Sequence, residues 1–182
     1  MLGTLSKLLK KSYQKGFTLI ELLVVLGILG ILAAALLAAI NPVEQLNKAQ
    51  DTSLKNTASE FISSTVQYYS AHNELPWTSS GCYSGGTTFS AVSLTSLKGC
   101  LSNVLIPEGE LKSSFINASN LGKIYVTNTT GDANDTMACF LPQSHAQQVD
   151  SNTKYVDDAG STTGNSSCIS QGGSTKCYWC AQ

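Results

Sequence analysis

The sequence predicts an α+β protein in which a long, bent amino-terminal helix packs against a small antiparallel β-sheet head with disulfides. Three observations predict it: an apolar block over residues 17–40, helical periodicity that continues to residue 75, and six cysteines that all lie beyond residue 80. We therefore divide the chain into a basic leader (1–16), a long helix (17–75) and an exported α+β globular head (76–182).

Composition and charge argue against two classes of protein. Only 13% of the 182 residues are charged, and all 11 basic residues are lysines. A clustered, arginine-rich surface typical of nucleic-acid binding is absent, so no nucleic-acid partner is expected. The low charged fraction also argues against a highly charged disordered chain. Four lysines lie in the leader. The rest of the chain contains seven lysines and 12 acidic residues, which gives it a net charge of −5.

The apolar block from Phe17 to Ile40 is long enough to cross a membrane. As a helix it would extend about 36 Å, against a hydrocarbon core of ~30 Å. The residues before it include four lysines and no acid, so the amino terminus is expected to stay cytoplasmic and the head to be exported. The leader lysines are Lys7, Lys10, Lys11 and Lys15.

Two simpler interpretations of the block are a cleaved secretory signal and a plain signal anchor. A secretory signal would be cut near residues 33–35, but the apolar run over residues 22–40 is longer than the roughly 7–15 residues typical of such signals. Neither interpretation explains Glu21, because a carboxylate inside a membrane segment is costly and usually persists for a partner or a function.

The segment KGFTLIE at residues 15–21 resembles the processing site of type IV prepilins and related pseudopilins. The resemblance covers a short basic leader, Gly16, Phe17, Glu21 and the apolar helix that follows. It implies cleavage between Gly16 and Phe17 by a prepilin peptidase/methyltransferase, and N-methylation of Phe17 by the same enzyme. It also implies that the subunit joins other pilin subunits in a homopolymer filament, with the help of an inner-membrane assembly platform.

Glu21 is expected to act in assembly and not in catalysis. Cleavage would create a cationic amine on Phe17, and a neighbouring subunit's Glu21 would neutralise it inside an apolar bundle. Breaking such a buried pair costs about 3–5 kcal/mol, so the pair would set the register between subunits. By the same resemblance, Gly30 and Pro42 are expected to mark where the helix kinks or loosens.

After Pro42 the periodicity predicts an amphipathic helix over residues 43–75. Apolar side chains recur at intervals of three and four residues, which predicts the face that packs on the head. This stripe consists of Val43, Leu46, Ala49, Leu54, Ala58, Phe61, Ile62, Thr65, Tyr68 and Tyr69. Two charge pairs with i,i+4 spacing are expected on the solvated face: Glu44 with Lys48, and Asp51 with Lys55.

The head is rich in Ser, Thr, Asn and Gly, and its expected elements are short. Leucines spaced three and four apart predict a second helix over residues 94–105. Strands are expected at 123–127 and 136–141, around a polar turn at 130–135, and further short strands at Ile169 and 177–179.

Six cysteines in an exported head predict three disulfides. The Gly172-Gly173 dipeptide suits a two-residue hairpin turn, which would place Cys168 opposite Cys177 with Cα atoms about 4.5 Å apart. Cys82 and Cys100 bracket a short loop whose closure would contribute about 3 kcal/mol. The remaining pair is then Cys139 with Cys180. A redox pair of Cys177 with Cys180 and a zinc site with His145 are competing interpretations.

No cofactor and no resident metal are expected, and the chain lacks a phosphate-binding loop, a dinucleotide fingerprint and a nucleophile elbow. Calcium is the one candidate ion, because carboxylate and amide oxygens gather in two polar segments. These segments contain Asp132, Asn134 and Asp135, and Asp157 and Asp158.

The sequence thus favours a structural subunit of a type IV pilus: a prepilin, not an enzyme, inserted once in the inner (cytoplasmic) membrane. After processing it would polymerise into an extracellular filament for adhesion, motility or uptake. The alternative is a pseudopilin of a type II secretion system, which would form a periplasmic pseudopilus. A monomeric membrane-anchored domain and a DNA-uptake minor pilin are less favoured, the first because the head shows no concentrated polar constellation.

Overall fold

The computed structural model describes residues 16–39, 41–78, 82–160 and 166–182, which fall into two compact units, Met1–Asn41 and Pro42–Gln182. The first unit contains helix α1 (Leu19–Ala39). The second contains helix α2 (Pro42–His72) and the head. The predicted α+β class, with a helix on an antiparallel sheet and disulfides, is confirmed. The long helix expected over 17–75 is described as these two helices, with residue 40 between them outside the described part.

Helix α2 has well-defined ends. Pro42 is its first residue, a position where the missing N–H is not needed and the fixed φ suits the helix. At the other end Asn73 adopts a left-handed φ of 56°, and its N–H donates to the carbonyl oxygen of Tyr69 at 2.7 Å. This left-handed cap ends the helix before the expected boundary at Leu75.

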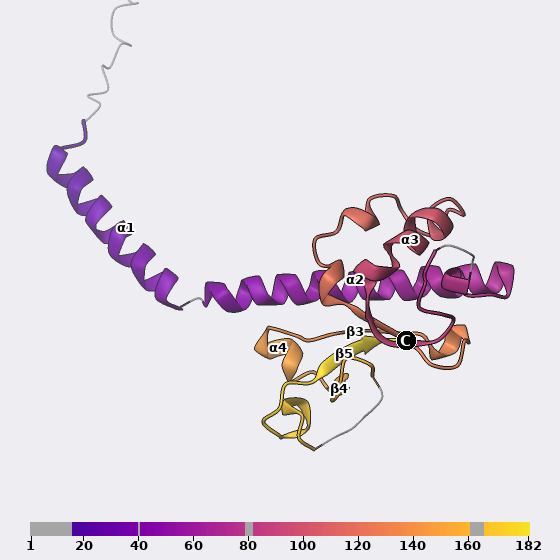
Figure 1. Ribbon diagram of the computed structural model, residues 1–182. Helices are drawn as coiled ribbons and strands as arrows, with labels where there is room; N and C mark the ends of the chain where they lie inside the picture. Colours follow the sequence, from indigo (N-terminus) through magenta and orange to yellow (C-terminus); the bar gives the residue numbers. More distant parts are fainter. Residues whose placement is uncertain (1–15, 40, 79–81, 161–165) are drawn as a thin grey trace, which may run out of the picture. The chain divides into compact units, whose positions relative to one another are not determined.

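The head contains a five-stranded antiparallel sheet in the order β1-β2-β3-β5-β4. Helix α2 packs against β3 and β5, and Figure 1 shows it running across the sheet. The carboxyl-terminal strand β5 lies between β3 and the short edge strand β4. The strands are β1 (Phe89–Ser93), β2 (Tyr125–Asn128), β3 (Met137–Phe140), β4 (Thr153–Tyr155) and β5 (Tyr178–Ala181).

Strands β2, β3 and β5 lie where the sequence predicted them, whereas β1 and β4 were not predicted. The pairing of β1 with β2 is irregular, because Ala91 adopts a φ of 52° and its N–H donates to the Thr127 hydroxyl at 3.0 Å. Such a bulge breaks the alternation on which strand prediction depends. The strand expected at Ile169 is wrong, since residues Ile169–Gln171 form a 3₁₀ turn.

The predicted second helix is confirmed as one helical segment with changing pitch. It comprises a 3₁₀ turn (Leu94–Leu97), helix α3 (Lys98–Cys100) and a π-helical turn (Leu101–Leu105). In Figure 1 this segment and the β3–β5–β4 part of the sheet lie on opposite sides of α2. The core therefore contacts α2 on two sides. The four leucines of the segment, Leu94, Leu97, Leu101 and Leu105, are fully buried in it.

The apolar stripe of α2 is buried only where the head covers it. Leu54, Ala58 and Phe61 belong to the core, whereas Val43 is 62% and Leu46 64% exposed. Burying a Leu or Phe side chain contributes roughly 1.5–3 kcal/mol, so the later half of the stripe holds the helix on the sheet. The first turns of α2 keep an apolar face outside this core.

The charged face of α2 differs from the prediction at two positions. Asp51 is buried, and its carboxylate accepts hydrogen bonds from the loop before helix α4 (His145–Gln148). Lys55, its expected partner, instead lies with Nζ 5.0 Å from the centroid of the Trp179 ring. A local i,i+4 rule failed here because both side chains contact segments that are far away in the sequence.

Three disulfides hold the head together, and their pairs are those expected from the sequence. They are Cys82–Cys100, Cys139–Cys180 and Cys168–Cys177. The pair formed by Cys139 and Cys180 joins directly opposed residues of β3 and β5, with Cα atoms 4.0 Å apart. This covalent link anchors the carboxyl-terminal strand to the middle of the sheet.

The hairpin geometry predicted for the third pair is wrong. The chain winds into the 3₁₀ turn after Cys168 and ends it at Gly172, whose φ of 87° is left-handed. Cys168 then forms an isolated parallel bridge with Thr175, and not the antiparallel pair with Cys177 that a Gly-Gly turn would give. The Cα atoms of Cys168 and Cys177 are 5.5 Å apart. This separation is still within disulfide range.

Candidate functional site

The segment before α1 presents the expected cleavage bond in a non-helical stretch. Gly16, Phe17 and Thr18 precede the first helical residue. A Cβ added to Gly16 would meet no atom within 4 Å, and the Phe17 side chain is 85% exposed. Nothing within the described unit covers this bond, as a peptidase substrate requires. Residues 1–15, which hold the leader lysines, lie outside the described residues.

Thr18 and Glu21 form a reciprocal cap at the start of α1. The Thr18 N–H and hydroxyl both donate to Oε2 of Glu21 at 2.8 Å, and the Glu21 N–H donates to the Thr18 hydroxyl oxygen at 3.2 Å. This arrangement is a capping box, which satisfies helix donors that have no partner inside the helix. It also holds a negative charge at the positive end of the helix dipole.

Sequence reasoning assigned Glu21 a partner in another subunit but missed this partner within the chain. The signal was present, because Thr18-Leu19-Ile20-Glu21 has the T-x-x-E spacing of a capping box. The cap fixes the carboxylate beside the backbone of Thr18, one residue from the Phe17 nitrogen. Glu21 is thus placed at the helix start in the isolated chain.

Apart from Glu21, helix α1 is apolar on all sides, and among the residues that the structure describes it packs against no other element of its unit. Residues 19–37 have a mean hydropathy of 2.8 and none of their side chains is buried. An apolar helix without a buried face suits a lipid environment or the inside of a helix bundle. Length and hydropathy therefore suggest membrane insertion for this helix, as expected from the sequence.

The two expected kink positions lie in different settings. Gly30 is inside α1, where the helix is continuous, and a Cβ there would meet no atom within 4 Å. Pro42 is the first residue of α2. Loosening of the helix between them stays a prediction.

The first calcium candidate is a loop that already uses its oxygens as hydrogen-bond acceptors. The Asp135 carboxylate accepts from the Thr129 hydroxyl at 2.7 Å and from the N–H groups of Thr129 and Thr130. Hydrogen bonds from the Thr129 side chain and backbone hold the pKa of Asp135 below its usual value, against a smaller opposing effect of burial. Asp132 caps the turn by accepting from the Asn134 N–H.

The metal alternatives find no support in the part of the chain that the structure describes. There, no group of three His, Cys, Asp or Glu side chains is placed to hold a metal ion. All six cysteines are in disulfides, so neither a zinc site with His145 nor a redox pair of Cys177 with Cys180 is formed.

Tyr178 lies on the outward side of β5, near the second acidic segment. Burial, followed by the nearby negative charge of Asp158, raises the pKa of its phenol. Asp157 also lies near this tyrosine. Among the described residues, the two calcium candidates do not form a group of three acidic, His or Cys side chains that could hold a metal ion.

Comparison with known proteins identifies the amino-terminal segment. A family model described as the prokaryotic N-terminal methylation motif matches residues 11–37. The chain is also 38% identical over 86 residues to a fimbrial protein of Neisseria meningitidis serogroup A; this match covers 47% of the chain and 45% of the relative. The chain thus spans less than half the length of that relative. No solved structure matches the chain significantly.

Both matches confirm the resemblance found in the sequence. The chain carries a prepilin-type methylation motif and is distantly similar to a pilin. The motif also implies processing by a prepilin peptidase. These similarities concern the amino-terminal methylation motif and about half of the chain.

Proposed function

We propose that this chain is the prepilin of a structural subunit of a type IV pilus. One observation carries the proposal: two residues after the Gly16-Phe17 bond an apolar helix begins at Leu19, with Glu21 in its capping box and no buried side chain over residues 19–37. A helix of this kind needs an apolar surrounding before and after export. The inner membrane supplies it first, and a bundle of neighbouring subunits supplies it in the filament.

Processing converts the amino-terminal segment into an assembly group. The prepilin peptidase hydrolyses the bond between Gly16 and Phe17, which removes the four leader lysines and frees the α-amine of Phe17. The methyltransferase then methylates this amine, which keeps its positive charge. The loss of the leader changes the net charge of the chain from −1 to −5.

Assembly then depends on the charge of Glu21. Its carboxylate is held at the start of α1 by Thr18, so it enters the bundle in a defined position. The Phe17 amine of a neighbouring subunit supplies the opposite charge. An unpaired charge in this apolar bundle would be strongly unfavourable, so only the register that pairs the two groups is stable.

The leader lysines set the orientation of the precursor. They stay on the cytoplasmic side of the inner membrane, and the disulfide-bonded head is exported. The membrane assembly platform and other copies of the subunit are the partners of the processed chain. In a pseudopilin of a type II secretion system the same steps would end in a periplasmic pseudopilus.

Mass spectrometry of two cell fractions tests the proposal. Sheared surface filaments and washed membranes should both contain a chain that begins at a methylated Phe17. A mature chain beginning near residue 35 would instead show a secretory signal. Mature protein found in membranes but never in surface filaments, with secretion lost in a deletion strain, would favour the pseudopilin.

A further inference from the structure

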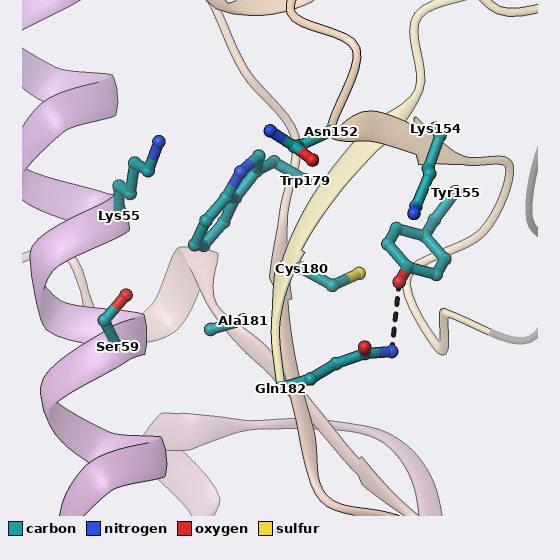
Figure 2. A pocket seen from close by; sticks show the side chains of 9 residues that line it. All are labelled: Lys55, Ser59, Asn152, Lys154, Tyr155, Trp179, Cys180, Ala181 and Gln182. Atoms are coloured by element: carbon teal, nitrogen blue, oxygen red, sulfur yellow. Dashed lines mark hydrogen bonds between the residues drawn. The ribbon is translucent and has the colours of Figure 1, made fainter.

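A hollow of about 320 Å³ lies where α2 meets the edge of the sheet formed by β4 and β5. Figure 2 shows Lys55 and Ser59 on α2 facing Trp179 of β5, with Lys154 and Tyr155 of β4 on the other side of β5. We call it the two-lysine cleft. It lies wholly within Pro42–Gln182, so it does not depend on α1 or on processing.

Each ammonium group of the cleft lies over an aromatic ring. Lys55 Nζ lies 5.0 Å from the centroid of the Trp179 ring, and Lys154 Nζ lies 5.7 Å from that of Tyr155. Within the described residues, neither lysine forms an ion pair with a carboxylate. Contact with an aromatic face restricts a flexible lysine while leaving its N–H groups unused.

The rings that hold the lysines are themselves fixed. Trp179 is 7% exposed and packs against Phe140, with ring centroids 5.4 Å apart. The Tyr155 hydroxyl accepts a hydrogen bond from Gln182 Nε2 at 3.0 Å. The neighbouring Cys180 is cross-linked to Cys139. The rings over which the cations lie are therefore fixed before any ligand arrives, which lowers the entropy cost of ordering this wall of the cleft on binding.

The charge around the cleft favours an anionic ligand. No acidic side chain is among its described lining residues, although the chain beyond the leader has a net charge of −5. A local pair of cations in a negative protein concentrates anions at that point. Since the lysines approach from α2 on one side and β4 on the other, a ligand with two separated charges would engage both.

Two uncharged polar side chains also line the cleft, Ser59 on α2 and Asn152 before β4 (Figure 2). The Ser59 hydroxyl and the Asn152 side-chain amide can each donate and accept hydrogen bonds. This chemistry fits the hydroxyl groups of a sugar ring. Nucleic acid fits poorly, because Trp179 and Tyr155 are buried and offer no exposed ring on which a base could stack.

We propose that the two-lysine cleft binds an acidic oligosaccharide, with carboxylates on two different sugar units paired to Lys55 and Lys154. Hydroxyl groups of the sugar rings would form hydrogen bonds with Ser59 and Asn152. Binding at this cleft would give the exported head a function beyond filament building, namely attachment to acidic surface glycans.

The test is an NMR titration of the full chain in neutral detergent at low salt, with trigalacturonate as the probe. The chain has two tryptophans, so the indole N–H of Trp179 reports on the cleft and that of Trp77 serves as an internal control. Trp77 lies in the core, and its indole N–H donates a hydrogen bond to the Thr87 carbonyl oxygen. We expect the Trp179 signal to shift in a saturable manner and the Trp77 signal to stay unchanged.

Matched variants and probes decide the outcome. Lys55→Gln and Lys154→Gln should each weaken binding about three- to tenfold, whereas Lys98→Gln, on α3 at the other side of α2, should not (Figure 1). The fully methyl-esterified probe should not bind. Equal binding by the cleft variants, or by the ester, would overturn the proposal. Equal binding of single-stranded DNA or polyglutamate would show a general anion site and reject the saccharide.

Discussion

The buried carboxylate of Asp51 on α2 accepts hydrogen bonds from the backbone N–H of Ser144 at 2.7 Å and from its hydroxyl at 2.6 Å. The N–H of Gln143 donates to the same carboxylate at 3.0 Å. Ser144 is the N-cap of α4, and its hydroxyl oxygen accepts from the Gln147 N–H. One side chain of α2 thus fixes a loop that lies 93 residues later in the chain.

Asp51→Asn is expected to lower the free energy of unfolding by about 1.5–3 kcal/mol, because hydrogen bonds to a buried charge are lost or weakened. Urea unfolding of the full chain in detergent, followed by near-UV circular dichroism, measures the change. Glu60→Gln is the control, since Glu60 is exposed on the same helix. The control should change stability by less than about 0.5 kcal/mol. Equal stability of both variants would show that Asp51 is not a structural link.

Glu21→Gln should block filament assembly and leave the head folded. Gln can still form the capping box with Thr18, so this change removes the charge and keeps the helix start. A neighbour's Phe17 amine would then lack its partner in an apolar bundle. The measurement compares filament yield with processed subunit in membranes, in cells that carry only the variant. Normal filament yield would show that Glu21 does not set the register.

Thr18→Ala makes the opposite change, because it removes the capping hydroxyl but keeps the Glu21 charge. Helix stability should fall by about 0.5–2 kcal/mol while filaments still form. Filament yield and amide exchange at the start of α1 measure the two effects. If Thr18→Ala abolished filaments as Glu21→Gln is expected to do, capping and not charge pairing would be the requirement.

The contribution of each disulfide to stability is expected to increase with the length of the loop that it closes. Cys139 and Cys180 have a sequence separation of 41, and Cys168 and Cys177 one of 9. In the chain-entropy model, removing the first pair costs roughly 4 kcal/mol and removing the second roughly 2.5 kcal/mol. Double Cys→Ser variants and urea unfolding measure both. Non-reducing peptide mapping of exported protein checks the pairs, and any other connectivity would contradict this framework.

Asp135 should make stability depend on pH in the acid range. A hydrogen bond from the Thr129 hydroxyl is the main cause that lowers the pKa of Asp135 in the folded state. The carboxylate therefore contributes fully to the free energy of unfolding above its unfolded pKa, and this contribution is lost as pH falls through the folded pKa. At pH 7 the free energy of unfolding should be higher for wild type than for Asp135→Asn. The difference should be no more than about 1 kcal/mol, because the carboxylate is partly exposed. The difference should vanish at the acid end of a pH series of thermal melts. A constant difference would contradict the ionised role of this carboxylate.

Local sequence was sufficient for the processing segment and helix α1. The length and uniform apolar character of residues 19–37 predict an exposed hydrophobic helix without reference to any other segment. The string at residues 15–21 likewise identifies its processing chemistry, because a peptidase recognises adjacent residues. The capping box of Thr18 and Glu21 is equally local, and its T-x-x-E spacing could have been used.

The head depended on contacts between distant segments, which periodicity does not encode. The charge pattern placed Asp51 and Lys55 together in solvent, but folding buries the first against the α4 loop and sets the second over Trp179. Strands β1 and β4 are short, and β1 carries a bulge, so they acquire strand structure only by pairing with neighbours. The two-lysine cleft exists for the same reason: packing α2 on β3 and β5 places Lys55 of the helix and Lys154 of the neighbouring edge strand around one hollow, although 99 residues separate them in the sequence.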